Sequence, residues 1–162
     1  MHTFTIKPIA ELLARYVGDG KGWIDPFAGE NSPAEITNDL NPAKPAQYHL
    51  HAEQFANEIQ GRFAGVLFDP PYSITQVKEC YQCIGMEDFI NRDSTHFPYA
   101  IKRAIAPKIR TGGYAISFGW NSCGFGKNLG FEIVEILIVC HGRQHNDTIV
   151  TVERKIQPTL FE

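Results

Sequence analysis

Short apolar runs bounded by glycine, proline and polar residues are the feature that most limits the folds open to this sequence. Runs of about four to eight residues between such breakers are typical of strands, and several longer segments between them carry helical patterns. We therefore expect an α/β protein whose seven-stranded sheet is mostly parallel, with one antiparallel strand near its edge. The expected strands cover residues 22–25, 34–38, 47–50, 65–69, 113–118, 132–140 and 148–154.

The clearest helical pattern lies near the start of the chain. Apolar residues recur at helical spacing between Ile6 and Tyr16, Pro8 suits the first turn of a helix, and Gly18 ends it. We expect a helix over residues 6–17. Further helices are expected over residues 52–60, 75–84 and 97–109.

Two connections are too short for the helix that normally links parallel strands. Residues 26–33 are all that separates the first two expected strands, and residues 40–46 carry Pro42 and Pro45. A parallel crossover usually takes about a dozen residues or more. We expect both crossover helices to be missing, which leaves apolar side chains on one sheet face in need of a cover. A homodimer that hides this face would provide that cover.

Length, composition and charge are those of an ordinary globular protein. At 162 residues, 43% of them apolar, the chain has room for one domain, expected over residues 1–162 without a separate target-recognition domain. No run approaches the ~18 apolar residues of a membrane span and no signal peptide is recognised, so we expect a cytoplasmic protein without membrane contacts. The net charge of −3 argues against a general nucleic-acid footprint. A local basic cluster, which a solvated helix face explains equally well, consists of Lys102, Arg103, Lys108 and Arg110.

The cysteines do not form a complete metal motif. Cys80 and Cys83 have the spacing of half a zinc site, but Cys123 and Cys140 stand far apart. Disulfides are unexpected in the cytoplasm. We therefore expect reduced, structural cysteines and no metal site.

The strongest chemical signal is the tetrapeptide Asp69-Pro70-Pro71-Tyr72, directly after the apolar run 66–68. The carboxyl end of a strand is where open α/β sheets bind ligands. An amine on an aromatic ring is a poor nucleophile, because its lone pair is delocalised into the ring. Two acceptors, the Asp69 carboxylate and the Pro70 carbonyl, can hold its two hydrogens and free the lone pair, while Tyr72 stacks on the ring. The alternative is a proline-rich turn that merely ends a strand.

Two further segments follow expected strands. Asp25 to Glu30 forms a turn in which Gly29 allows close approach to a ligand. Asp39 follows the second expected strand, where an acidic side chain can accept both hydroxyls of a ribose. For that segment alone, a plain Asx-turn is equally good.

Together, in this order and on strand ends, these segments resemble the amino-methyltransferase family that acts on adenine N6 and cytosine N4. The resemblance covers roughly residues 4–154 and implies a Rossmann-like methyltransferase fold with S-adenosylmethionine as cofactor. It also implies direct transfer of the methyl group to the amine, with Asp69, Pro70, Pro71 and Tyr72 as the catalytic motif. The cofactor residues that it implies are Thr5 and Lys7 at the methionine end, Asp25, Pro26, Phe27, Ala28 and Gly29 in the first turn, Asp39 and Leu40 at the ribose, and His51, Ala52 and Phe55 at the adenine.

The sequence departs from the family pattern at two positions in the cofactor segments. Asn31 stands where the family usually has a glycine, and His51 where an aspartate is usual. Substrate contacts are expected near Ser73, Trp120, Asn121, Lys127 and His145, each of which also has a structural explanation as a core, turn or loop residue.

Three functions fit this sequence. The first is a DNA adenine-N6 methyltransferase, with DNA favoured over RNA as partner. The second is an RNA or guanine-N2 methyltransferase with the same motif, and the third is a non-catalytic module that binds cofactor or nucleic acid.

Overall fold

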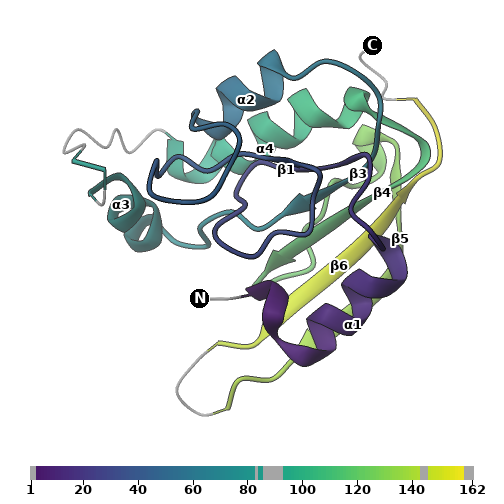
Figure 1. The fold of residues 1–162 in the computed structure, drawn as a ribbon. Coiled ribbons are helices and arrows are strands. Elements are labelled where there is room, and N and C mark those ends of the chain that lie inside the picture. Colours follow the sequence, from purple (N-terminus) through teal and green to yellow (C-terminus); the bar gives the residue numbers. More distant parts are fainter. Residues whose placement is uncertain (1–2, 83, 86–92, 143–145, 159–162) are drawn as a thin grey trace.

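The computed structural model describes residues 3–82, 84–85, 93–142 and 146–158. The helices and strands follow the expected order, with most boundaries shifted by one to four residues (Figure 1). The α-helices are α1 (Lys7–Tyr16), α2 (Ala52–Glu58), α3 (Ile74–Gln82) and α4 (Asp93–Ile105), and the 3₁₀ helices are η1 (Thr3–Thr5), η2 (Ala106–Lys108) and η3 (Lys127–Leu129). The strands are β1 (Trp23–Asp25), β2 (Ile36–Thr37), β3 (Phe63–Phe68), β4 (Ile109–Gly119), β5 (Phe131–Val139) and β6 (Thr148–Lys155).

The sheet is mixed and mostly parallel, as the sequence predicted. Its order is β2-β1-β3-β4-β6-β5. The pairs β1–β2, β1–β3 and β3–β4 are parallel, whereas β6 runs antiparallel to both β4 and β5. The single antiparallel strand therefore lies next to the edge, beside β5.

Among the described residues the sheet has six strands, not the expected seven. Residues 47–50 make only one bridge, between Tyr48 and Asn38. The reason is that side chains take over part of the pairing. The Asn38 Oδ1 atom accepts the Leu50 N–H at 2.9 Å, and the Gln47 Oε1 atom accepts the Thr37 N–H at 3.1 Å. No ladder of main-chain bonds can continue past them.

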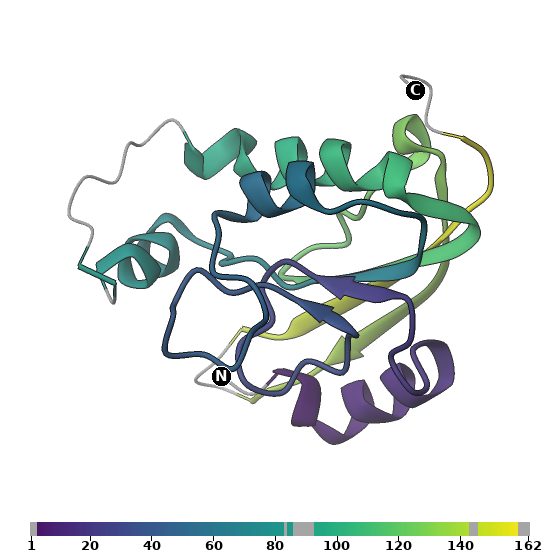
Figure 2. The same ribbon diagram turned by 45° about the horizontal axis from the view of Figure 1, so that its top comes forward.

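The helices lie on both faces of the sheet (Figures 1 and 2). On one face, α2 and α4 lie side by side and cover a cluster that includes Phe55, Phe68 and Ile105. On the other face, α1 packs through Ile9 and Leu12 onto the second buried cluster. Each such side chain contributes roughly 1.5–3 kcal/mol when it is fully buried.

Both short connections lack a helix, as their lengths predicted. Residues 26–35 and 38–51, all of which are described, run between elements without any α-helical turn. The helix expected over 97–109 ends earlier, at Ile105, because residues 106–108 form η2 around Pro107 and Ile109 already begins β4.

A third connection, residues 120–130 between β4 and β5, is also held by side chains. The buried Glu153 carboxylate accepts the N–H groups of Phe125 at 2.5 Å and Gly126 at 2.8 Å. On the other side, Lys102 donates to the carbonyls of Cys123 at 2.8 Å and Gly124 at 2.9 Å. A Cβ atom on Gly124 would lie 1.9 Å from the Glu153 carboxylate, so a larger residue there would displace this carboxylate.

Exposed apolar side chains gather on β5, at the edge of the sheet. Ile133, Val134, Ile136 and Ile138 are each about half exposed, with Ile138 the most open at 61%. This exposed apolar surface lies on β5. The homodimer that was expected to cover the side with the short connections stays a prediction. No helix in the described ranges has the length and apolar character needed to cross a membrane.

Candidate active site

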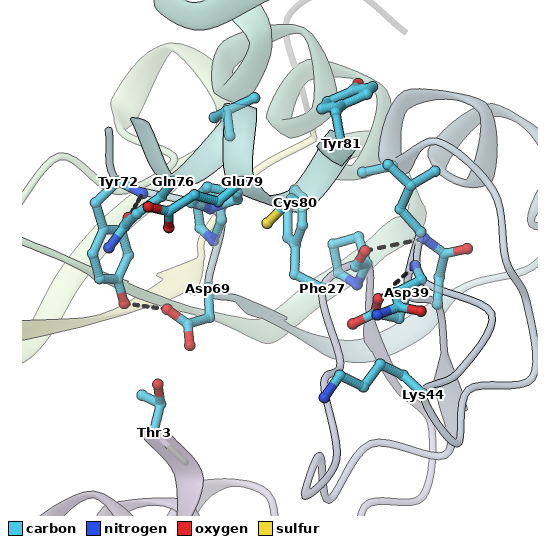
Figure 3. A pocket seen from close by; sticks show the side chains of 18 of the residues that line it. Thr3, Phe27, Asp39, Lys44, Asp69, Tyr72, Gln76, Glu79, Cys80 and Tyr81 are labelled. Atoms are coloured by element: carbon cyan, nitrogen blue, oxygen red, sulfur yellow. Dashed lines mark hydrogen bonds between the residues drawn. The ribbon is translucent and has the colours of Figure 1, made fainter. Parts of the chain in front are cut away.

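A pocket of about 740 Å³ opens at the carboxyl ends of the parallel strands. Figure 3 shows Asp69 and Tyr72 at one end of it, Asp39 at the other, and side chains of α3 along one side. The wall contains Thr3, Pro26, Phe27, Asn38, Asp39, Leu40, Asn41, Lys44, Leu50, His51, Ala52, Asp69, Pro70, Pro71, Tyr72, Gln76, Val77, Glu79, Cys80, Tyr81, Trp120, Asn146 and Thr148. The structure thus brings the tetrapeptide and much of the expected cofactor set into one cavity.

The Asp69 carboxylate faces this pocket directly after β3. It accepts a hydrogen bond from the Tyr72 hydroxyl, and Thr3 lies on the same wall of the pocket. Burial raises the pKa of the Asp69 carboxyl above its ordinary value, and the nearby hydroxyls of Tyr72 and Thr3 oppose the rise. Such a carboxyl is a better proton acceptor than an exposed aspartate once it is ionised.

Tyr72 stands between the carboxylate and the aromatic wall. Its ring meets Trp120 edge to face, with 5.6 Å between the centroids. Its N–H donates to the Gln76 Oε1 atom at 2.7 Å, which holds the backbone after the two prolines. Burial, and then the adjacent Asp69, raise the pKa of the Tyr72 phenol, so the hydroxyl stays protonated as a donor.

Asp25, an expected cofactor residue, lies outside the pocket lining. It is fully buried, and its carboxylate accepts the Phe27 N–H at 2.8 Å and the Ser32 hydroxyl at 2.6 Å. Burial raises the pKa of Asp25 to about 7, against the effect of these two hydrogen bonds. The side chain shapes the loop from which Pro26 and Phe27 reach the pocket.

Ala28 and Gly29 also lie outside the pocket lining, because their peptide groups are bound within the protein. Their backbone is bound to the neighbouring segment: Ala28 N–H donates to the Asn38 carbonyl at 2.9 Å, and Gly29 N–H to the Asp39 carboxylate at 3.0 Å. Gly29 has a φ of 59°, which favours glycine. These two hydrogen bonds therefore hold the segment that carries Asp39 in position.

Asp39 and Leu40 line the pocket as expected. The second Asp39 oxygen accepts the Asn41 N–H at 2.8 Å. Each carboxylate oxygen has a further lone pair for a ligand.

Sequence reasoning missed Asn38, which organises this end of the pocket. It is completely buried, and its amide donates to the carbonyls of Pro26 at 3.1 Å and Leu50 at 3.0 Å. An asparagine at the end of a strand was a weak signal, because its partners lie twelve residues away in both directions.

In the segment expected to contact the cofactor adenine, His51 and Ala52 line the pocket. Phe55, a residue of α2, is instead buried in the core. The His51 Nδ1 atom lies 3.2 Å from the Tyr81 hydroxyl of α3. Lys44, also missed, lines the pocket and forms an ion pair with Glu30 at 2.6 Å.

The start of the chain is placed differently from the expectation. Thr5 and Lys7 are exposed and outside the lining, while Thr3 takes a place on the wall. The 3₁₀ turn η1 explains the difference, because it turns Thr3 towards Asp69 and leaves Lys7 to begin α1 on the surface.

Of the expected substrate residues, Trp120 lines the pocket and three do not. Ser73 accepts the Gln76 N–H and so supports the first turn of α3, Asn121 accepts the Cys123 N–H, and Lys127 is exposed at η3. His145 lies outside the described residues. Close to it in the chain, Asn146 and Thr148, the first residue of β6, line the pocket.

The described cysteines are on the surface. Cys80 is exposed at the pocket, and Cys123 and Cys140 are exposed elsewhere; Cys83 lies outside the described residues. Among the described residues, no group of three or more His, Cys, Asp or Glu side chains is arranged to hold a metal ion.

Comparison with known proteins gives matches in structure but not in sequence. No family model and no curated protein sequence matches this chain. In structure it is similar to 1,6-didemethyltoxoflavin-N1-methyltransferase from Burkholderia thailandensis, solved with S-adenosylhomocysteine bound (TM-score 0.61, 13% identity, 93% of this chain and 78% of that one). It is also similar to the N-methyltransferase NodS from Bradyrhizobium japonicum, again with S-adenosylhomocysteine (TM-score 0.57, 11% identity, 95% and 88%).

A third similar structure is TrmN from Thermus thermophilus (TM-score 0.58, 14% identity). The match covers 91% of this chain and 48% of TrmN, so the chain spans about half the length of that protein. At such low identities a structural likeness shows the fold alone. This chain has the Rossmann-like fold of methyltransferases.

Proposed function

We propose that this protein is an S-adenosylmethionine-dependent methyltransferase that modifies the exocyclic amino group of a nucleic-acid base, adenine N6 in DNA. The observation that carries the proposal is the placement of the Asp69 carboxylate, after β3, in the same cavity as the Asp39 carboxylate, after β2. The fold is that of methyltransferases, and two similar proteins were solved with S-adenosylhomocysteine.

The Asp39 half of the pocket suits this cofactor. The Asp39 carboxylate retains acceptor capacity for ribose hydroxyls. Phe27, Leu40 and Leu50 supply apolar walls for a base beside that carboxylate. When bound, S-adenosylmethionine supplies a methyl group on a positively charged sulfur.

The Asp69 half suits an aromatic amine. The carboxylate can accept one amine hydrogen and the Pro70 carbonyl the other, which draws the nitrogen lone pair out of the ring. The two prolines fix this geometry, and positioning of this kind contributes much of the rate in reactions between bound partners. In such a transfer the carbon–sulfur bond of the donor would break as the carbon–nitrogen bond forms, and the nitrogen would give up a proton, for which Asp69 is the adjacent acceptor.

A base within a duplex is out of reach of such a pocket, so the target base must be flipped out or arrive single-stranded. Tyr72 and Trp120 form an aromatic wall on which the base can stack. Contacts of this type contribute about 1–3 kcal/mol per base.

Transfer of a tritiated methyl group tests the proposal. The protein is incubated with labelled S-adenosylmethionine and, in parallel, duplex DNA, single-stranded DNA and RNA, and the products are digested to nucleosides. We expect label in N6-methyl-2′-deoxyadenosine from DNA. Label only in RNA, or in N2-methylguanosine, would mean that the protein has a different substrate but the same methyl-transfer chemistry.

A non-catalytic module is the second candidate, and two contacts favour it. Asp69 is already paired with Tyr72, and Asp25 is used within the protein and not towards a ligand. Calorimetry with S-adenosylhomocysteine separates the candidates: no binding at millimolar ligand, together with no transfer, favours the module.

A further inference from the structure

Helix α3 forms one side of the pocket and begins two residues after the tetrapeptide. Gln76, Val77, Glu79, Cys80 and Tyr81 all line the cavity from this helix (Figure 3). Of the α3 side chains whose burial is described, only Val77 is buried. Figure 1 shows α3 apart from the pair α2 and α4. Its position therefore depends on contacts within the pocket.

Two hydrogen bonds connect α3 to the two halves of the cavity. Near its start, Gln76 accepts the Tyr72 N–H at 2.7 Å. Near its end, the Tyr81 hydroxyl lies 3.2 Å from the His51 Nδ1 atom, and the two rings are tilted relative to each other, with centroids 5.7 Å apart and an angle of 35°. Tyr81 is thus fixed next to His51, at the end of the cavity away from the tetrapeptide.

The surroundings of His51 have the character of a slot for a flat heterocycle. Leu40, Leu50 and Ala52 supply apolar surface to the pocket, and hydrogen bonds join the segment before His51 to Asn38 and Asp39. A ribose bound by Asp39 would place its base near this segment. His51 lines the pocket there and could meet the edge of that base.

The contact with Tyr81 decides what His51 can offer. A phenol is a good hydrogen-bond donor and a poor acceptor, whereas a neutral imidazole has one nitrogen that accepts and one that donates. The Tyr81 hydroxyl therefore donates to Nδ1, and the proton of the ring is held on Nε2. In this form His51 presents an N–H donor, which matches an unprotonated ring nitrogen of adenine.

We propose that Tyr81 is a specificity-determining residue: it holds His51 in the form that donates from Nε2 and so selects adenine over a 6-oxopurine in the cofactor site. Hypoxanthine carries a hydrogen at N1, where adenine has a lone pair, and two donors then face each other. The inference rests on the proposed function, because the adenine is that of S-adenosylmethionine.

Calorimetry with two ligands tests this role without any methyl transfer. The ligands are S-adenosylhomocysteine and its deaminated analogue S-inosylhomocysteine. The wild-type protein is expected to bind the adenine compound about three- to tenfold more tightly, the effect of one hydrogen bond. In Tyr81→Phe, which keeps the ring and removes the hydroxyl, this preference should fall to less than twofold.

Tyr99→Phe is the matched control, since Tyr99 is half exposed on α4 and outside the pocket lining. It should behave as wild type with both ligands. Thermal unfolding of each variant shows that the fold is kept. A preference unchanged in a folded Tyr81→Phe protein would overturn the inference while leaving the proposed function intact.

Nitrogen-15 NMR of the imidazole gives an independent readout in the free protein. We expect His51 to carry its proton on Nε2 in the wild type and a mixture of both forms in Tyr81→Phe. A proton on Nδ1 in the wild type would reject the inference directly. Failure of both ligands to bind any variant, by contrast, is a failure of the proposed function.

Discussion

Tyr72 donates its hydroxyl hydrogen to the carboxylate of Asp69, so two residues of one tetrapeptide are hydrogen-bonded to each other at one end of the pocket. An incoming amine has to take over this acceptor. The Tyr72 ring remains available for stacking beside Trp120. The hydroxyl and the ring of one side chain therefore have opposite effects on substrate binding.

Substitution of Tyr72 should separate these effects. Tyr72→Phe frees Asp69 and is expected to keep kcat and to lower KM for nucleic acid by up to about tenfold, within the range of one hydrogen bond to a charged group. Tyr72→Ala also removes the stacking surface and should lower kcat/KM by about ten- to a hundredfold. Steady-state kinetics on one oligonucleotide measures both, and equal losses in the two variants would contradict this account.

Asp69→Ala should abolish methyl transfer and leave the affinity for S-adenosylhomocysteine nearly unchanged, because Asp69 lies at the end of the pocket away from Asp39. Calorimetry and transfer assays check the two parts. Asp19→Ala, an exposed aspartate after α1, serves as the control. Loss of both transfer and binding would assign Asp69 to the cofactor.

The pH profile of transfer should show the effect of burial on Asp69. Because burial raises the pKa of this carboxyl, its ionised form, which accepts the amine hydrogen, is lost at a higher pH than for an exposed aspartate. The acid limb of kcat against pH is therefore expected above the ordinary value of about 4. An acid limb below that value would show that the carboxylate is stabilised by its hydrogen bonds more than it is destabilised by burial.

The raised pKa of Asp25 predicts that the folded protein becomes less stable as pH rises. Its pKa is about 7 in the folded protein against 3.8 for the free side chain, so between these values the folded state binds a proton that the unfolded state has lost. The contribution is fully present below pH 3.8 and is lost as pH rises through about 7. Asp25→Asn, which keeps an acceptor for Phe27 and can donate to Ser32, should flatten this dependence and raise Tm at pH 8 by several degrees. Calorimetric scans at pH 6 and pH 8 provide the measurement.

Substitution of Glu153, which is buried and not part of the pocket lining, is predicted to lower the stability of the protein strongly. Glu153→Ala leaves the Phe125 and Gly126 N–H groups without their acceptor, and we expect the free energy of unfolding in urea to fall by about 2–4 kcal/mol. Glu132→Ala, an exposed glutamate on the neighbouring strand, should change it by less than about 0.5 kcal/mol. Similar losses in both variants would mean that the contacts of Glu153 contribute little.

The apolar surface of β5 predicts a homodimer at the sheet edge. Sedimentation at micromolar concentration should show a dimer for the wild type and a monomer for Ile136→Lys, while Ile156→Lys, equally exposed beyond β6, should stay dimeric. A wild-type monomer would reject the prediction.

The sequence predicted the fold well because strand ends are marked locally. The apolar run before Asp69 and the breakers around Asp25 and Asp39 define where the strands stop, and parallel strands bring those ends together. The lengths of two connections were enough to exclude helices there. The missing seventh strand could not be predicted, since it depends on how Asn38 meets Leu50.

Most of the pocket residues named from the sequence follow a strand end, as Asp69 and Asp39 do, whereas His51 and Ala52 follow a segment that makes only one bridge. Thr3, Lys44 and Tyr81 reach the cavity from segments whose patterns are ordinary, and contacts between distant parts of the chain place them there. Conversely, Asp25 and Phe55 have the right residue types, but their side chains are buried within the protein. A motif indicates which residues lie near a ligand and not which way each side chain points.

The two helix-free connections beside the pocket have a consequence for mutational tolerance. The peptide groups of a helix are hydrogen-bonded to one another, so most single substitutions on its surface leave the helix intact. Here Asp25, Asn38 and Asp39 hold the peptide groups instead, through one amide and two carboxylates. In a saturation mutagenesis survey, position 25 should accept little besides asparagine, and positions 38 and 39 should accept almost no other residue. Loss of the hydrogen bonds at any one of them should disturb the whole Asp39 half of the pocket.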